Sequence, residues 1–427
     1  MLKVLFVNTS DHAGGAAIAA CRLLKALRLQ GVDAKMLCAK RSLSVANEDI
    51  IYLKHKRLYK LKFLFERLEI FIKNGFSRRN LFAADTSRFG NDITKLQAFK
   101  DVDIIHLHWI NQAMLSMKDI ERIMQTGKPV VWTMHDMWNI TGVCHQAGKC
   151  KRWQQQCEQC EVLCRPSKHD LSYQTFRRKQ RLYNKYKFAF VGCSQWLASF
   201  AKESPLLQHQ RVESIPNAID TSYYAPLSDS ANVTRNELRK RLGLPTDKLL
   251  ILFTAFKVTD PNKGIDYLIE SISLLCQEHP ELRNKVGIVL AGQGAEKLKH
   301  SFAVEAYPMG YVANEERMLQ LYQTADLLAM PTLMDNLPNT IAEAMACGVP
   351  CVAFSVGGVP QMIDAGVNGY LAAYQDSLDF AHGIAAVLLS PNYESLCRNA
   401  RAKAVNAYSE ANIAQKYINL YRDLLKK

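Results

Sequence analysis

Long apolar segments are missing from this sequence of 427 residues. No apolar run approaches the roughly 18–20 residues that a membrane-spanning helix requires, so the sequence predicts no such helix. The first residues, MLKVLFVNTS, contain one basic residue and a short apolar run. That pattern is typical of a first β-strand and not of a signal peptide. We therefore expect a soluble, cytoplasmic protein.

Acidic residues are fewer than basic ones, since 54 Lys and Arg stand against 40 Asp and Glu, a formal charge of +14. The excess favours polyanionic partners such as nucleic acid, an anionic membrane or phosphate-bearing small molecules.

Short-period repeats and low-complexity linkers are also absent. The loop HAGGAA has too few glycines for a dinucleotide-binding fingerprint. The length predicts two or three domains with sizeable cores.

Apolar strands and helices alternate along the chain in two series. Continuous apolar strands of this kind belong in parallel sheets covered on both faces. The predicted fold class is therefore α/β, with two Rossmann-like doubly wound domains that face a cleft. Ligands bind at the carboxyl ends of the strands in such sheets, so the cleft is the expected binding site. We expect an N-terminal domain over 1–217, joined by a C-terminal helix 409–427 that crosses back, and a second domain over 218–408.

The segment DNLPNTIAEAMACGVP places Glu343 inside a short, otherwise apolar helix. Asn339 and Thr340 are both good N-caps, and Gly348 is a good stop signal. One interpretation is a capping box, in which Glu343 bonds a backbone N–H near Thr340. The other is that Glu343 and Asp335 present carboxylates to a ligand at the end of the preceding strand.

Two lysines flank the turn FKVTDPNKGID between a strand and a helix. Lys257 and Lys263 beside a helix N-terminus form a plausible diphosphate clamp, although a lone pair of lysines is often only solvated charge. Carboxylates bind hydroxyls well and repel bare phosphate. Lysines and carboxylates at one edge of a sheet together indicate a sugar nucleotide.

Several motifs recur at intervals along nearly the whole chain: Gly14 and Gly15 after the first strand, then SIPNAID, NKGID, AGQG, MGYV, DNLPNTIAEAMACGVPCVAFSVGG and DAGVNGYL. In these motifs the chain resembles the retaining glycosyltransferases of family 4, which have the GT-B fold and include enzymes of bacterial polysaccharide synthesis.

The resemblance implies roles for residues at these motifs. Glu343 matches a glutamate that binds the donor's ribose, and Asp335 stands where the family has a glutamate near the donor sugar. His135 is expected beside the reactive face of that sugar. The implied catalytic residues are His135, Lys263, Asp335 and Glu343, and the implied donor-binding residues are Gly15, Lys257, Lys263, Gly310, Tyr311, Asn339, Thr340 and Glu343. Asp335 departs from the family's glutamate by keeping the charge on a shorter side chain. Two further departures are Ala218 in place of the family's glycine and Lys257, one residue from the position of the family's arginine.

Three histidines lie at or near the ends of predicted strands: His106, His108 and His135. Each can equally be a hydrogen-bonded core residue. His108 is a candidate on the acceptor side of the site.

Five of the twelve cysteines fall between Cys144 and Cys164. Cys157 and Cys160 form a Cys-x-x-Cys pair, and Cys144 with Cys150 can complete a tetrahedral structural zinc site. The alternative is a loop of reduced thiols without metal. The resemblance implies that catalysis itself requires no cofactor, because protein cations stabilise the leaving diphosphate.

The segment 54–80 carries nine Lys and Arg against two Glu. Its apolar residues Leu58, Leu61, Phe65, Leu68 and Ile72 fall on one helical face. This pattern predicts either a basic amphipathic helix on an anionic bilayer or a helix that packs its apolar stripe onto the N-terminal domain.

The expected function is transfer of a sugar, with retention, from a nucleotide diphosphate sugar to a carbohydrate or lipid-linked glycan in cell-surface polysaccharide synthesis, at the inner face of the plasma membrane. The alternatives are a sugar-nucleotide epimerase of the same fold and, from another class, a zinc-containing nucleic-acid-binding protein. Since only HKRLYKLKF combines basic and aromatic residues as nucleic-acid binding requires, no nucleic-acid partner is expected.

Overall fold

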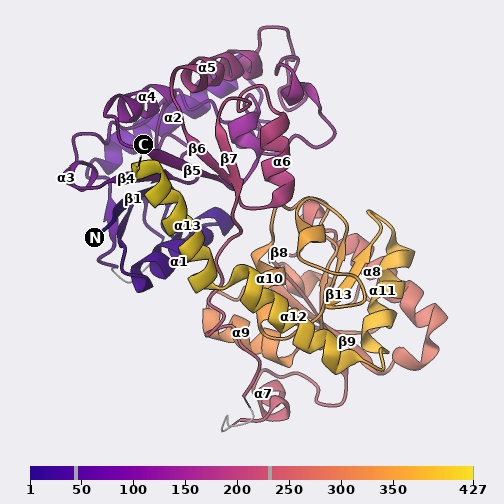
Figure 1. Cartoon of the computed structure of the whole chain (residues 1–427). Helices are drawn as coiled ribbons and strands as arrows, with labels where there is room; N and C mark the ends of the chain where they lie inside the picture. The colour runs from indigo at the N-terminus through magenta and orange to yellow at the C-terminus, as the bar shows by residue number, and fades with distance from the viewer. Residues whose placement is uncertain (43–46, 229–232, 427) are drawn as a thin grey trace. The chain divides into compact units, whose positions relative to one another are not determined.

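The computed structural model of the chain describes residues 1–42, 47–228 and 233–426. These residues form two compact units (Figure 1). Unit 1 comprises Met1–Ala218 and the C-terminal segment from Ile413, and unit 2 comprises Ile219–Asn412. The sequence placed the boundary after residue 217 and the return at 409.

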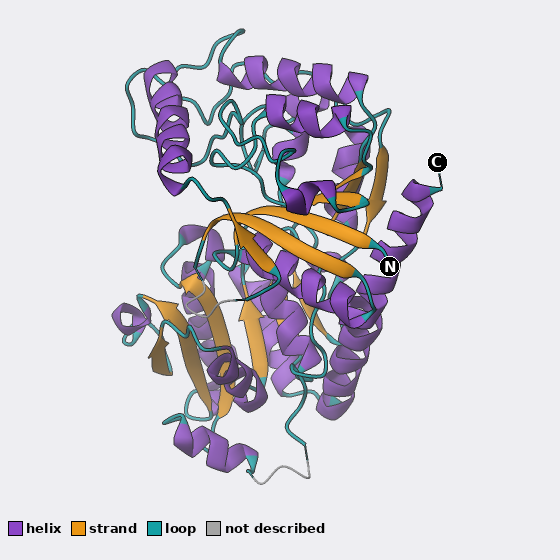
Figure 2. Cartoon of the chain, turned by 90° about the vertical axis from the view of Figure 1, so that its left-hand side faces the viewer, coloured by secondary structure: helices purple, strands orange, loops and turns teal. Residues whose placement is uncertain are grey.

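Unit 1 contains a seven-stranded parallel sheet in the order β3-β2-β1-β4-β5-β6-β7. The strands are β1 (Lys3–Ser10), β2 (Asp33–Lys40), β3 (Ile50–Tyr52), β4 (Ile104–Leu107), β5 (Val130–Met134), β6 (Ala189–Gly192) and β7 (Arg211–Ser214). Helices lie on both faces of the sheet (Figure 2). They are α1 (Gly15–Leu29), α2 (Lys56–Lys73), α3 (Gln97–Lys100), α4 (Met117–Gln125), α5 (Leu171–Lys185) and α6 (Gln195–Glu203), with the short 3-10 helices η1 (Met137–Ile140) and η2 (Arg152–Gln154).

Unit 2 contains a six-stranded parallel sheet in the order β10-β9-β8-β11-β12-β13. Its strands are β8 (Leu249–Lys257), β9 (Val286–Gln293), β10 (Glu305–Gly310), β11 (Leu327–Met330), β12 (Cys351–Phe354) and β13 (Gly369–Ala372). Its helices are α7 (Arg235–Arg241), α8 (Ile265–Glu278), α9 (Glu315–Thr324), α10 (Asn339–Ala346), α11 (Ser377–Leu388) and α12 (Tyr393–Tyr408), with η3 (Pro261–Lys263), η4 (Pro280–Leu282), η5 (Ala295–Leu298) and η6 (Val359–Gln361). The prediction of two doubly wound α/β sheets is confirmed.

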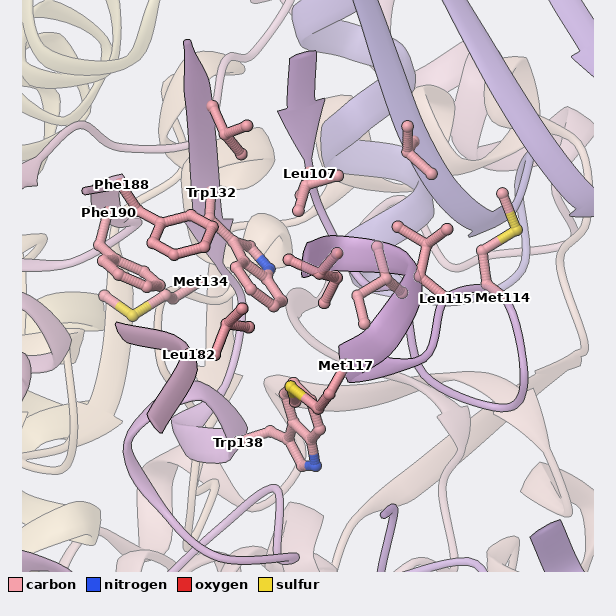
Figure 3. Packing of buried hydrophobic residues seen from close by; sticks show 14 of the residues in the cluster. Leu107, Met114, Leu115, Met117, Trp132, Met134, Trp138, Leu182, Phe188 and Phe190 are labelled. Atoms are coloured by element: carbon pink, nitrogen blue, oxygen red, sulfur yellow. The ribbon is translucent and has the colours of Figure 1, made fainter. Parts of the chain in front are cut away.

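The strands of unit 1 are apolar throughout because side chains of both faces are buried. In β1, Leu5 and Val7 belong to one core cluster, and Val4 and Phe6 belong to another on the opposite face. Figure 3 shows the first cluster, in which Trp132 stacks on Phe190 with ring centroids 5.8 Å apart. Large aromatic side chains fill this core cluster and pack the strands of the sheet against the helices that cover it.

The last helix, α13 (Glu410–Leu425), packs its C-terminal part on the second face of unit 1, beside α1 (Figure 1). Two tyrosines anchor it to buried polar groups of the sheet. The hydroxyl of Tyr417 lies 2.9 Å from Thr133 Oγ1, and that of Tyr421 lies 2.7 Å from His106 Nδ1. These bonds satisfy polar atoms that would otherwise be costly to bury.

The short helix α10 is almost wholly buried, as its apolar sequence predicts. Its N-cap is Pro338, which makes no side-chain cap, so Asn339 and Thr340 occupy the first two helical positions. The prediction that either of them is the N-cap is therefore wrong. Gly348 follows the C-cap Cys347 with φ of +75°, the left-handed conformation expected of a glycine that ends a helix.

Candidate functional site

In unit 2 the strand order reverses between β8 and β11, so the connections that follow these two strands leave the sheet in opposite directions. Such a reversal opens a crevice at the carboxyl ends of the strands. The two loops nevertheless touch, because Leu333 N–H donates to the carbonyl of Asn262 at 2.8 Å. Gly264 permits this approach: its φ is +71°, and a Cβ there would collide with the carbonyl of Pro331.

The contact between the loops brings two predicted site residues together. Lys263 Nζ lies 3.0 Å from Asp335 Oδ2, and the two side chains are only 29% and 20% exposed. An ion pair in this half-buried position holds both groups at the mouth of the crevice. The arrangement offers one ammonium group and one carboxylate to a ligand.

Glu343 lies deeper, on α10. Its side chain is buried, and its Oε2 accepts a hydrogen bond of 2.7 Å from the hydroxyl of Tyr322 on α9. Burial, and then the charge of Glu343, raise the pKa of Tyr322 well above its usual range, so the tyrosine stays a donor. Because α10 has no side-chain cap, the capping-box interpretation of Thr340 and Glu343 is wrong.

Three further predicted donor-side residues lie at the carboxyl ends of β8 and β10. Lys257 is the exposed last residue of β8, and Gly310 ends β10 with φ of +65°. Tyr311 follows it, is 53% exposed, and meets the exposed ring of Phe256 edge to face at 5.3 Å. Sequence reasoning missed Phe256, whose only signal was an aromatic residue next to the lysine at the end of a strand.

In unit 1 the strand order reverses between β1 and β4, and two predicted histidines meet next to this point. His108 Nδ1 lies 3.0 Å from His135 Nε2. Burial lowers the pKa of His135 to about 4 and that of His108 well below its usual range, so one neutral ring donates to the other. Both line a small cavity with Thr133 and Asn217, and His108 Nε2 is buried there with no partner among the described residues.

His106 is a core residue. It is fully buried, with Nδ1 2.7 Å from the hydroxyl of Tyr421 and Nε2 2.8 Å from Thr133 Oγ1. Both ring nitrogens therefore have partners, as the core interpretation of a strand-end histidine requires.

A partly buried hydrogen-bond network that the sequence did not reveal begins at Asp136, the residue after His135. Asp136 accepts hydrogen bonds from Trp109 Nε1 at 3.0 Å and from His145 Nδ1 at 2.7 Å, and His145 Nε2 donates to Asp85 at 2.7 Å. Burial opposes a charge on His145, but the carboxylates of Asp136 and Asp85 raise its pKa to about 10. The imidazolium between two carboxylates fixes the loop that follows β5.

The loop at the start of α1 carries the paired glycines. Gly14 has φ of +91° and precedes the first residue of α1, the exposed Gly15. A Cβ at Gly14 would meet nothing within 4 Å, so no neighbouring atom in unit 1 excludes a side chain. Glycine is instead favoured there because of the positive φ. The predicted contact of Gly15 with a donor stays a prediction.

Four cysteines of the segment 144–164 line one cavity of unit 1: Cys144, Cys150, Cys157 and Cys160. Burial raises the pKa of the Cys160 thiol, while the nearby backbone N–H groups of Val162 and Leu163 oppose that rise. In residues 1–42, 47–228 and 233–426, no three His, Cys, Asp or Glu side chains stand close enough together to hold a metal ion.

Helix α2 exposes the apolar stripe that the sequence placed on one face. Leu58, Leu61, Phe65, Leu68 and Ile72 are 44–47% exposed. The buried residues of α2 are instead Tyr59, Glu66, Arg67 and Ile70. The interpretation that the stripe packs onto unit 1 is therefore wrong. None of the helices in the described part of the chain combines the length and apolar character needed to cross a bilayer.

Family models match both units. The model described as Glycosyltransferase Family 4 matches residues 13–223, and that described as Glycosyl transferases group 1 matches residues 248–390. The chain belongs to glycosyltransferase family 4. The predicted family is thus confirmed, and with it the assignment of the chain as a glycosyltransferase.

Curated relatives are glycosyltransferases as well. The D-inositol 3-phosphate glycosyltransferase of Xylanimonas cellulosilytica is 31% identical over 51% of this chain and 52% of its own length. The putative colanic acid biosynthesis glycosyl transferase WcaC of Escherichia coli is 23% identical over 75% of this chain and 76% of its own. The match to the inositol phosphate enzymes spans about half of their length.

Solved structures share the fold. Sucrose-phosphate synthase from Thermosynechococcus elongatus superimposes with a TM-score of 0.67 at 16% identity, covering 100% of both chains. HepE from Anabaena, determined in complex with UDP and glucose, gives a TM-score of 0.63 at 17% identity, covering 99% of this chain and 100% of its own. These likenesses support the predicted GT-B architecture of two α/β units.

The geometry around Glu343 generates a test of its role. Glu343→Gln keeps the shape and an acceptor for Tyr322, but it removes one carboxylate oxygen and the charge. If the carboxylate binds donor hydroxyls, losing one charge-assisted bond of about 1.5–3 kcal/mol should lower kcat/KM for the sugar donor roughly ten- to a hundredfold. The melting temperature should change by only a few degrees.

Tyr322→Phe is the matched control, because it removes the buried hydrogen bond that Glu343→Gln keeps and leaves the carboxylate in place. We expect it to lower stability more than Glu343→Gln does and to lower kcat/KM less. Equal losses of stability in the two variants, with wild-type kcat/KM in both, would show that Glu343 serves only the packing of α9 on α10.

Proposed function

We propose that this glycosyltransferase moves a sugar, with retention of anomeric configuration, from a nucleotide diphosphate sugar to a carbohydrate or lipid-linked glycan in cell-surface polysaccharide synthesis. The observation that carries the proposal is the pairing of Lys263 with Asp335 at the strand reversal of unit 2. A sugar nucleotide is a ligand that needs a cation and a carboxylate side by side.

The donor class is supported by chemistry and by likeness. The ammonium group of Lys263, with Lys257 nearby in sequence, suits a diphosphate, whereas the carboxylates of Asp335 and Glu343 suit sugar hydroxyls. Structures of the similarly folded HepE were determined with UDP and with UDP-glucose. The name of the relative WcaC, a putative colanic acid biosynthesis enzyme, supports a polysaccharide acceptor.

The ion pair suggests how binding and catalysis are linked. Without donor, Asp335 neutralises Lys263. When a diphosphate binds, its oxygens take over Lys263, and the carboxylate is released to accept hydrogen bonds from the sugar. Lys263 then stabilises the charge that develops on the departing diphosphate, a preorganised electrostatic effect.

Retention follows in this proposal from attack on the same face that the leaving group departs from. The acceptor hydroxyl forms the new bond to the anomeric carbon as the bond to the diphosphate oxygen breaks, and a phosphate oxygen takes the hydroxyl proton. His135, a neutral imidazole, is proposed as a hydrogen-bond partner of the transferred sugar. No covalent sugar–enzyme intermediate is needed.

The donor proposal is tested by a thermal-shift screen of UDP, GDP, ADP and their sugars. A bound ligand at about 100 times its Kd adds about 2.7 kcal/mol of stability. Lys263→Ala should lose that stabilisation and lower kcat about 10²–10³-fold, the usual effect of removing one preorganised donor. Lys297→Ala, at another exposed lysine of unit 2, is the control and should behave as wild type.

Three results would count against the proposal. Stabilisation by none of the nucleotides removes the donor class, and full activity of Lys263→Ala removes the clamp. Conversion of the sugar nucleotide without formation of a glycosidic bond would identify an epimerase instead.

We further propose that α2 places the enzyme on the surface of an anionic membrane, at the inner face of the plasma membrane. The exposed apolar stripe is flanked by exposed basic residues: Lys54, Lys56, Arg57, Lys60, Lys73, Arg78 and Arg79. Nearby, Phe76 and Phe82 add apolar surface at 66% and 62% exposure. Apolar area next to positive charge fits a bilayer that contains anionic lipid.

Vesicle sedimentation tests the membrane proposal. Wild type should bind vesicles of phosphatidylglycerol and phosphatidylcholine, and binding should weaken with added salt. Lys56→Glu and Phe65→Ser should each weaken it several-fold, since one basic residue near such a surface contributes about 1 kcal/mol. Leu389→Ser changes a similarly exposed leucine of unit 2 and should have no effect.

Binding that ignores the charge of the lipid, or equal binding by Phe65→Ser and wild type, would contradict a membrane role for α2. In that case the stripe would have to meet some other partner.

A further inference from the structure

The four cysteines that line one cavity of unit 1 come from a loop region with little regular structure. The segment between η1 and α5 contains only the short η2. Cys144 and Cys157 are buried, and Cys150 and Cys160 are partly buried, around a cavity of about 20 Å³. Loops of this length and irregularity need an internal anchor, because they have few backbone ladders of their own.

A backbone N–H group already points at one of the sulfurs. Gly142 N–H donates to Cys157 Sγ at 3.1 Å. Such a bond stabilises negative charge on sulfur. The position of Cys157 is therefore suited to a thiolate.

A buried lysine stands beside this loop. Lys179 on α5 is fully buried, and its Nζ donates to the carbonyls of Trp138, Thr141 at 3.0 Å and Gly142 at 3.2 Å. Burial lowers the pKa of Lys179 to about 7, and the Cys157 and Cys144 thiols oppose that fall. A zinc ion with four thiolates carries two net negative charges, and such a charge beside Lys179 would favour its ammonium form.

The histidine of the segment is committed elsewhere. His145 donates from both ring nitrogens, to Asp136 and to Asp85, each at 2.7 Å. With neither nitrogen available as an electron-pair donor, His145 does not compete for a place in the ligand set. Cys164 does not line the cavity, so the set contains four thiols.

We propose that Cys144, Cys150, Cys157 and Cys160 bind one structural zinc ion. Four sulfur ligands in a tetrahedral arrangement are typical of zinc, with Zn–S distances of about 2.3 Å. Among the described residues no three of these side chains stand close enough together to hold a metal ion, so binding requires the four to close on the cavity that they already share. The ion would fix the loop that follows His135 and carries His145.

Zinc content is the first measurement. Protein purified from zinc-supplemented cells should contain close to one zinc ion per chain. Cys157→Ser should lose that equivalent and melt several degrees lower, because the metal contributes to folding. Cys164→Ser changes an exposed cysteine of the same segment, and it should keep both the zinc and the wild-type melting temperature.

A measurement on the wild-type protein covers the case in which Cys157→Ser does not fold. Replacement with Co²⁺ should give the sulfur-to-metal charge-transfer band and the strong visible bands of a tetrahedral thiolate site. Titration with a mercurial thiol reagent should release one zinc ion. Wild-type protein without zinc, cobalt protein without these bands, or a disulfide between any two of the four cysteines would overturn the proposal.

Discussion

The contact between the loops after β8 and β11 is the constraint on which the candidate donor site depends. Two neighbouring parallel strands send their chains in opposite directions, and Gly264 lets one of the two loops approach the carbonyl of Pro331 in the other. Lys263 and Asp335 are adjacent as a consequence, although 72 positions separate them in the sequence. A larger residue at position 264 would separate the cation from the carboxylate.

The class of fold could be predicted because burial on both faces of a sheet makes each strand continuously apolar, as in β1. The shorter and more polar strands gave no such signal: β3 has three residues, and every residue of β7 is only partly buried. The ends of α10 show a similar limit. Residue propensity correctly predicted that Gly348 ends the helix. The N-cap, however, is Pro338, because the preceding loop places it there, and local residue preferences do not encode the course of that loop.

Within the candidate sites, the sequence identified residue types at strand ends but not their partners. His106 lies in β4 and His108 directly follows that strand, yet the first bonds to α13 and the second faces a cavity. The difference is made by Tyr421, which lies more than 300 residues away in the sequence. The partner of Glu343, Tyr322, belongs to another helix and was equally invisible. Contacts over such separations depend on tertiary packing.

The apolar stripe of α2 is a second feature whose role the sequence alone could not decide. A helical pattern with one apolar face is what a core helix and a surface-binding helix have in common. Only the structure distinguishes them, because α2 buries the ion pair of Glu66 and Arg67 and leaves its leucines exposed. Buried charge on one face and exposed apolar side chains on the other invert the usual arrangement of a core helix.

The exchange of Asp335 for a diphosphate at Lys263 is tested most directly by calorimetric titration with the nucleoside diphosphate that stabilises the wild type. Without a sugar, Asp335 only competes for Lys263, so Asp335→Asn should tighten binding about fivefold, the worth of a partly exposed ion pair of roughly 1 kcal/mol. The tightening should disappear when Lys263→Ala is also present. Unchanged or weaker binding by Asp335→Asn would contradict the exchange.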